Sequence, residues 1–195
     1  DLDNEVGGLN ATAVESSAKM GSRVVWMPTY SAMADRKHKG LDGGIYLLDD
    51  VGKLVPEVHA ILEQVKAHDM VLATGHISTK ESLVLGEEAR NLGIGRGGVT
   101  HGTTMSFWTG MTLEDMKTLA TMGAYIEQCL NVKEPLTYRL APRELVETIM
   151  AIGTENCIVS TDFGQDYHPM PAEGFRMGIA TLLQAGMEEV EVGML

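Results

Sequence analysis

Helical patterns and short apolar runs alternate along the whole chain, and this alternation restricts the fold more than any other feature of the sequence. Each short run is rich in apolar or β-branched residues and follows a helical pattern, most of which stop at a glycine. The expected strands are Val24–Met27, Val71–Thr74, Gly98–Thr100, Ala124–Glu127 and Cys157–Ser160. Such alternation indicates parallel βαβ units, and strands this short and apolar are typical of sheets covered on both faces.

Helix-start signals precede the strands at the spacing that βαβ units need. Asn10 can cap a helix that runs to Met20, and Ser78 with Glu81 has the form of a capping box. After Pro56, apolar residues recur at i, i+3, i+4 and i+7, which indicates one buried helix face. Further helices are expected from Thr112 to Gly123, from Pro142 to Gly153 and from about Pro171 to Ala185.

Two α/β architectures fit this pattern: a partial (β/α)8 TIM barrel and an open doubly wound parallel sheet. A complete barrel typically needs about 250 residues, and the chain has 195, whereas five strands would complete an open sheet. We expect residues 1–195 to form a single domain, incomplete if it is a barrel. The two ends favour a fragment, because there is no initiator Met and the last residues resemble the start of a helix. The connection over residues 31–55 is long for a βα loop and indicates a hairpin or lid.

Composition excludes several classes of partner. The chain carries 27 acidic and 15 basic residues, a formal net charge of -12, so general affinity for nucleic acid or an anionic membrane is not expected. The longest apolar runs are far short of the ~20 residues that span a bilayer. Two cysteines are too few for a disulfide framework, which favours a reducing cytoplasm. The expected partner is a small-molecule substrate.

Four residues with metal-binding or acid–base side chains follow four successive strands. They are His76, His101, Glu127 and Asp162. Because the carboxyl ends of parallel strands meet at one rim in both architectures, we expect these side chains to converge. Imidazole nitrogen and carboxylate oxygen hold zinc or a similar divalent ion with a position left open for water. The sequence therefore predicts a metal site at this rim.

Other polar residues are weaker candidates. Arg139, in the loop after Glu127, is a candidate for binding a substrate carboxylate or phosphate, and His168 follows Asp162 on the same rim. We predict substrate-binding roles for Glu127, Arg139 and His168. Cys129 has no paired base in the sequence and is expected to be structural. The loops after the strands, including residues 102–110, are expected to set specificity.

The strand-end motifs resemble the later strands of the amidohydrolase superfamily, and more narrowly an uncharacterised branch of TIM-barrel metal-dependent hydrolases. The resemblance covers nearly the whole chain. The segments that carry it are Val24-Val25-Trp26-Met27-Pro28-Thr29, Leu72-Ala73-Thr74-Gly75-His76-Ile77-Ser78, Val99-Thr100-His101, Ala124-Tyr125-Ile126-Glu127 and Ser160-Thr161-Asp162-Phe163-Gly164-Gln165. By this resemblance the chain corresponds to about strands 4 to 8 of the barrel, with their helices.

The resemblance also implies a function and a ligand set. His76 and His101 match the metal-binding histidines of strands five and six, and Asp162 matches the strand-eight aspartate that binds metal and handles the proton of the attacking water. The first-strand His-x-His of the superfamily does not occur in the chain, and Pro28 and Thr29 stand where binuclear members carry a bridging group. One divalent ion, with zinc as the expected metal, is therefore implied. His101 is implied as a ligand or as a hydrogen-bond donor to the developing oxyanion.

The implied activity is that of a metal-dependent hydrolase acting on an amide, ester, lactone or related bond. Two alternatives stay open: a metal-dependent decarboxylase of the same fold, and a catalytically silent barrel or binding module. An open barrel arc would leave an apolar edge strand near residues 24–27, which favours self-association into a homo-oligomer.

Overall fold

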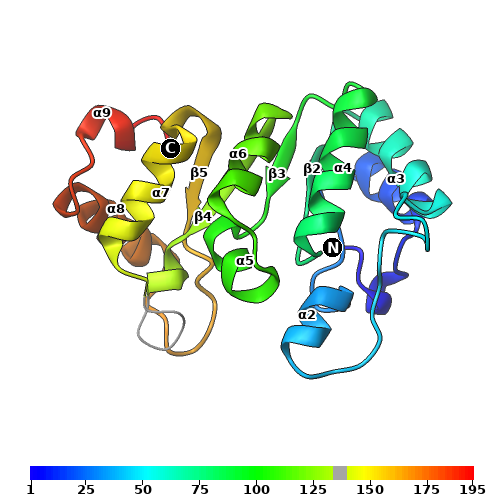
Figure 1. Ribbon diagram of the computed structural model, residues 1–195, viewed down its shortest axis with the longest axis horizontal. Helices are drawn as coiled ribbons and strands as arrows, with labels where there is room; N and C mark the ends of the chain where they lie inside the picture. The colour runs from blue at the N-terminus through cyan, green and yellow to red at the C-terminus, as the bar shows by residue number, and fades with distance from the viewer. Residues whose placement is uncertain (134–139) are drawn as a thin grey trace.

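A five-stranded, all-parallel sheet organises the chain in the computed structural model, which describes residues 1–133 and 140–195. Helices separate the strands along the chain, so each crossover is a βα or βαα connection (Figure 1). The strands are β1 (Val24–Trp26), β2 (Val71–Ala73), β3 (Gly97–Val99), β4 (Ala124–Cys129) and β5 (Cys157–Ser160). The α/β class and the approximate position of every expected strand are confirmed.

The strand order is β1-β2-β3-β4-β5, the same as the order along the chain. A doubly wound sheet reverses its strand order at a switch point, whereas a barrel adds each new strand beside the last. The open doubly wound alternative is therefore wrong, and the sheet is an arc of a (β/α)8 barrel. Within the described residues β1 and β5 each pair with one strand only, which confirms the expected open arc.

Helices cover the outer side of the arc, with α4, α6 and α7 side by side in Figure 1. The longer helices are α1 (Ala11–Lys19), α3 (Pro56–Ala67), α4 (Thr79–Asn91), α6 (Leu113–Thr121), α7 (Pro142–Ile152) and α8 (Pro171–Gln184). The shorter ones are α2 (Met33–His38), α5 (Gly102–Thr109) and α9 (Glu189–Val192), with 3-10 turns η1 (Asn4–Val6), η2 (Leu130–Lys133) and η3 (Thr154–Asn156). The predicted Asn10 cap and the capping box of Ser78 with Glu81 are both present.

Two connections differ from the sequence-based expectation. Residues 102–110, expected as a loop, contain helix α5, which packs directly on β4. Gly102 permits this close approach, because a Cβ there would lie 2.5 Å from the side chain of Ile126. Residues 31–55 contain the expected small hairpin, closed by the antiparallel bridge of Leu48 with Leu54, but they also form helix α2 and a parallel bridge of Ala32 with Ile45. In both places packing against neighbouring elements sets the structure, which local sequence patterns do not encode.

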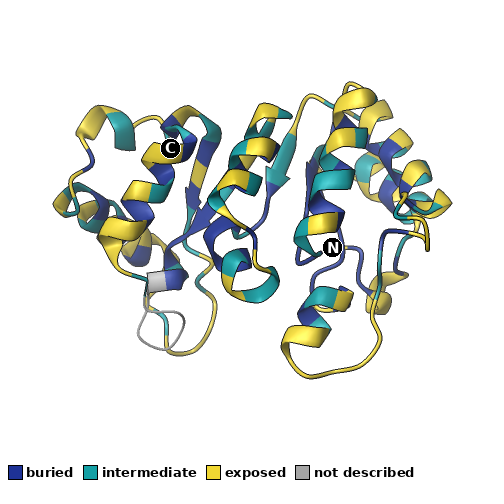
Figure 2. Cartoon of the chain, in the orientation of Figure 1, coloured by how far each residue is buried: buried dark blue, intermediate teal, exposed yellow. Residues whose placement is uncertain are grey.

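The hydrophobic core follows the sheet in two clusters. One gathers around β1, β2, α1, α3 and α4, and the other around β3 to β5 with the helices that follow them. Figure 2 shows mostly buried and intermediate residues along the strands, and helices that are buried on one face and exposed on the other. In the part of the chain that the structure describes, every helix is too short or too polar to cross a membrane. The hydrophobic core therefore runs along the strands and helices, and the polar residues of the rim follow the carboxyl ends of the strands.

Candidate metal site at the strand ends

A cavity of about 420 Å³ opens at the carboxyl ends of the strands. His76, His101 and Asp162 all line it, which confirms that these three side chains share one rim. Its remaining lining residues are Tyr30, Asp35, Lys39, Thr104, Trp108, Asn131 and Gln165. The volume falls within the range of about 300–1,000 Å³ that is usual for small-molecule sites.

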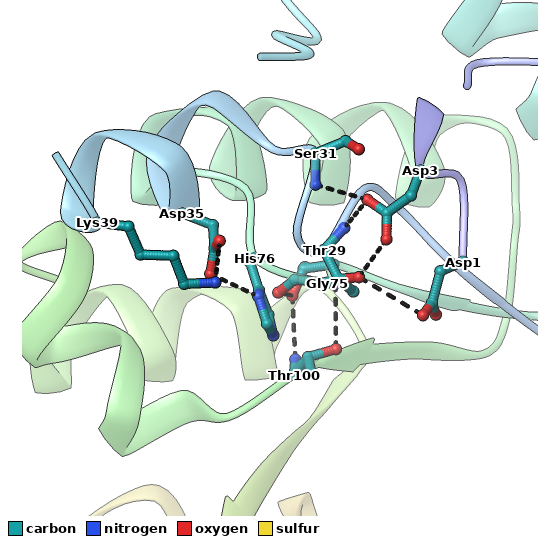
Figure 3. Close-up of polar contacts among 10 residues, drawn as sticks. Asp1, Asp3, Thr29, Ser31, Asp35, Lys39, Gly75, His76 and Thr100 are labelled. Atoms are coloured by element: carbon teal, nitrogen blue, oxygen red, sulfur yellow. Dashed lines mark hydrogen bonds and ion pairs between the residues drawn. The ribbon is translucent and has the colours of Figure 1, made fainter. Parts of the chain in front are cut away.

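Hydrogen bonds from backbone N–H groups to threonine hydroxyls hold the ends of β2 and β3 together and so bring the two histidines close. The Gly75 N–H donates to Thr100 Oγ1 at 3.1 Å, and the Thr100 N–H donates to Thr74 Oγ1 at 3.0 Å (Figure 3). His76 and His101 directly follow these clamped residues, and their ring centroids are 5.3 Å apart. The pairing of the strand ends therefore fixes the spacing of the imidazoles.

His101, Cys129 and Asp162 form a candidate metal-binding triad at the ends of β3, β4 and β5. One ligand atom from each, a nitrogen, a sulfur and a carboxylate oxygen, lies within 4.8 Å of the other two. His101 Nδ1 and Cys129 Sγ are 2.8 Å apart. Cys129 is buried, His101 is half-buried and Asp162 is exposed. His101 and Asp162 line the cavity, and Cys129 lies behind them.

The backbone is left-handed at two members of this triad. His101 has φ 55° and Asp162 has φ 53°. A non-glycine residue in this region costs on the order of 1 kcal/mol or more and persists where the surrounding structure enforces it. His101 is also the N-cap of α5, so the turn from β3 into α5 directs its side chain. Such strain is found at functional sites more often than elsewhere.

Burial governs the electrostatics of the triad. Burial raises the pKa of the Cys129 thiol well above its usual range, and the nearby carboxylates of Glu127 and Asp162 raise it further. Burial also lowers the pKa of His101, against the opposing effect of Asp162. Without a cation, burial therefore favours the neutral form of both the thiol and the imidazole. A divalent cation would reverse this preference at the sulfur, because it stabilises the thiolate.

Polar neighbours support the triad from β4 and β5. The Ser160 hydroxyl donates to Glu127 Oε1 at 2.9 Å, and Ser160 Oγ lies 3.2 Å from Cys129 Sγ. The backbone N–H of His101 donates to Glu127 Oε2 at 3.4 Å. Asn131 Nδ2 donates to Asp162 Oδ2 at 2.5 Å, which leaves the other carboxylate oxygen for the cavity. Each member of the triad thus has a hydrogen-bonding neighbour that orients it.

His76 lies beside the triad and pairs with a residue from α2. Its Nδ1 is 3.0 Å from Asp35 Oδ1, and the Asp35 carboxylate also accepts from Lys39 Nζ at 2.6 Å. Burial raises the pKa of Asp35, but the hydrogen bonds from His76 and Lys39 lower it by more, so it lies below its usual range. Trp108 packs edge-on against the His76 ring at 4.8 Å.

The three predicted substrate-binding residues have different surroundings. The Glu127 carboxylate accepts hydrogen bonds from the Ser160 hydroxyl and from the backbone N–H of His101. His168 stacks on Phe163 at 4.2 Å between ring centroids, within the loop that follows β5. Arg139 lies outside the described residues. The substrate-binding roles of all three stay predictions, as does the role of His76 as a metal ligand.

Two residues of the site do not follow from the strand-end pattern. Cys129, expected to be structural, lies in the candidate metal triad. Alternation along β4 is the signal that points to it, because residues two apart on a strand share a face and Glu127 is already at the rim. Asp35 has no comparable signal. Its hydrogen bond to His76 joins residues 41 apart in sequence, and Asp35 lies on a short helix within a long connection.

The donor set of the triad fits a transition-metal ion. Nitrogen, thiolate sulfur and carboxylate oxygen are the ligands of zinc in proteins, and three protein ligands with an open position are typical of catalytic zinc sites. The rim is also acidic around the triad, with Glu127 and Asp162 close to the thiol. Both features suit a divalent cation.

The fold is that of an α/β barrel, of which this chain forms five parallel strands with their helices. A crystal structure of an amidohydrolase from Pseudomonas aeruginosa superposes with a TM-score of 0.67 at 14% sequence identity. The superposition covers 95% of this chain and 64% of that chain. At this identity the likeness shows the fold alone.

The chain belongs to the protein family described as "Family of unknown function (DUF6282)", whose sequence model matches residues 1–127. This range includes His76 and His101 and ends before Cys129 and Asp162. The sequence has no match among curated proteins.

Proposed function

We propose that the chain carries the metal site of a hydrolase that cleaves an amide, ester, lactone or related bond with a metal-activated water. The observation that carries the proposal is the convergence of His101, Cys129 and Asp162 at the carboxyl ends of β3, β4 and β5, beside a cavity that His101 and Asp162 line. This is the face on which (β/α)8 barrels place their catalytic residues. The amidohydrolase-type fold supports the same class of reaction.

The residues of the triad would hold one divalent ion, with zinc as the metal that best suits their donor atoms. Such an ion, when bound, supplies Lewis-acid polarisation of the scissile group and brings the pKa of water toward neutrality. Asp162 is the exposed member, and its hydrogen bond from Asn131 holds the carboxylate in one orientation. Its second oxygen can accept the proton of the attacking water and return it to the leaving group.

The cavity also suits a small-molecule substrate. Tyr30 and Trp108 give it aromatic walls that pack edge-on against His76, and Lys39 supplies a cationic group. Aromatic walls with few polar groups are typical of sites that bind small molecules. We therefore expect a compact substrate with an apolar or planar part next to its reacting bond.

A catalytically silent binding module is the second candidate, and one observation favours it. The rim groups satisfy each other, through His101 with Cys129, Ser160 with Glu127, and Asn131 with Asp162. A silent module would keep these bonds and bind no cation. Metal binding therefore separates the two candidates.

The experiment compares the wild-type protein with Asp162→Asn in a screen of esters, amides and lactones, after chelation and after zinc is added back. Asp166→Asn, in the exposed loop that follows Asp162, is the matched control. We expect zinc-dependent hydrolysis that Asp162→Asn lowers by roughly 10²-fold or more while substantial zinc stays bound. Normal turnover of Asp162→Asn would contradict the proposed role of Asp162. Release of carbon dioxide from carboxylate substrates without hydrolysis would instead identify a decarboxylase.

A further inference from the structure

Helix α2 places a buried carboxylate directly behind His76. The side chain of Asp35 is 1% exposed, and its two oxygens have different partners. Oδ1 lies 3.0 Å from His76 Nδ1, and Oδ2 accepts from Lys39 Nζ at 2.6 Å (Figure 3). Lys39 in turn lies over the Tyr30 ring, 4.5 Å from its centroid. The carboxylate is therefore anchored by a cation on one side and faces the imidazole on the other.

This arrangement determines which nitrogen of His76 carries the proton. A lysine ammonium can only donate, and an ionised carboxylate can only accept. Asp35 thus accepts from both partners, so the proton of a neutral His76 lies on Nδ1. The second ring nitrogen, Nε2, is then left with a free lone pair. In this form His76 cannot donate a hydrogen bond from Nε2, so it suits a ligand better than a donor to an oxyanion.

Aromatic contacts hold the ring of His76 in place. Trp108 packs edge-on at 4.8 Å and Tyr30 at 5.8 Å between ring centroids. The His101 ring lies at 5.3 Å. Two imidazoles on one tetrahedral ion, with metal–nitrogen distances of about 2 Å, have ring centroids about 5 Å apart. The spacing of His76 and His101 is therefore compatible with a shared cation.

We propose that Asp35 is a positioning residue that holds His76 as its Nδ1–H tautomer and presents the Nε2 lone pair to the cavity as an additional ligand for a divalent cation. The binding of a cation rests on the proposed function, whereas the assignment of the His76 tautomer does not. Helix α2 thereby becomes part of the site, although it belongs to the connection between β1 and β2. Carboxylates that orient metal-binding histidines in this way typically contribute 10–100-fold to metal affinity.

The test measures the tautomer directly, by long-range ¹H–¹⁵N NMR of the histidine rings in the metal-free protein. His76→Gln identifies the His76 signals among the six histidines. We expect the Nδ1–H tautomer in the wild type. In Asp35→Asn, Lys39 and His76 compete for the single amide oxygen, so we expect a substantial Nε2–H population. Zinc affinity, measured by titration against a chelator, should fall 10–100-fold.

Asp42→Asn is the matched control, since Asp42 is an exposed aspartate in the same connection. It should leave both the tautomer and the zinc affinity unchanged. An Nε2–H tautomer of His76 in the wild type would overturn the positioning role, and this result needs no variant to fold. An unchanged tautomer in Asp35→Asn would overturn it as well. If the wild type binds no zinc while His76 is the Nδ1–H tautomer, the proposed function and the ligand role fail together, and the positioning of His76 by Asp35 stands.

Discussion

Glu81 should contribute much more to stability than an ordinary helix-capping residue. It closes the capping box of α4, where Oε2 accepts from the backbone N–H and the hydroxyl of Ser78 at 2.9 and 2.6 Å. Its other oxygen, Oε1, accepts from the backbone N–H of Leu47 at 2.8 Å. Glu81 is 1% exposed and Leu47 is fully buried. One side chain thus joins α4 to the connection that carries α2.

The expected magnitude follows from these bonds. Losing a helix cap costs about 1 kcal/mol, and leaving the buried Leu47 N–H without an acceptor costs about 1–3 kcal/mol more. Burial raises the pKa of Glu81 despite its hydrogen bonds, so removing the carboxylate also relieves a desolvation cost that offsets part of the loss. We expect Glu81→Ala to lower the free energy of unfolding by about 2–4 kcal/mol.

Asp115→Ala supplies the matched control, because Asp115 closes the same kind of capping box with Thr112 at the start of α6. The Asp115 carboxylate accepts from the backbone N–H and the hydroxyl of Thr112, which are local bonds, so its loss should cost about 1 kcal/mol. Urea unfolding followed by circular dichroism measures both variants. At an m-value of about 2 kcal/mol/M, the midpoint should fall by about 1 M or more for Glu81→Ala and by about half that for Asp115→Ala. Equal losses would refute the role of the Leu47 bond.

Further outcomes are expected at other positions. Burial raises the pKa of Asp3, but hydrogen bonds from residues 29–31 lower it by more. The stability that the ionised Asp3 carboxylate gives the folded protein should therefore be present above about pH 4 and disappear as pH falls through the lowered folded pKa. Urea unfolding at several pH values should show the stability gap between wild type and Asp3→Asn closing toward low pH, and a gap that widens there would contradict this. Gly75→Ala should lower the free energy of unfolding by more than about 2 kcal/mol, because φ is +60° and the new Cβ would lie 2.3 Å from a backbone carbonyl oxygen; a melting temperature equal to the wild type would exclude that clash. His76→Ala should lower the metal content measured by mass spectrometry, whereas unchanged content would remove His76 from the ligand set.

The sequence predicts the sheet and much of the rim for one physical reason. Parallel strands that follow each other in a barrel end at the same edge, so polar residues directly after the strands must converge. His76, His101 and Asp162 share one cavity on this basis. Strand order distinguishes the barrel from a doubly wound sheet. Local patterns of helices and strands do not encode that order, so the sequence alone leaves both folds open.

The parts of the site that escape prediction depend on contacts between distant segments. Cys129 looks like a core cysteine in sequence, and its proximity to His101 arises only when β3 and β4 are paired. Asp35 reaches His76 because α2 folds back over the strand ends, within a connection expected to be a hairpin or lid. Helix α5 forms where a loop is expected, because packing on β4 stabilises a helix that its own sequence does not predict.

Cobalt binding tests the metal site most directly, because a cobalt–thiolate bond gives a charge-transfer absorption in the near ultraviolet. Cys129 and Cys157 are both buried and free, but Cys157 lies at the opposite end of the neighbouring strand. We predict that the wild type and Cys157→Ser bind one Co²⁺ with this absorption and that Cys129→Ser loses it. Absence of the absorption in the wild type, or its persistence in Cys129→Ser, would contradict a metal site built on His101, Cys129 and Asp162.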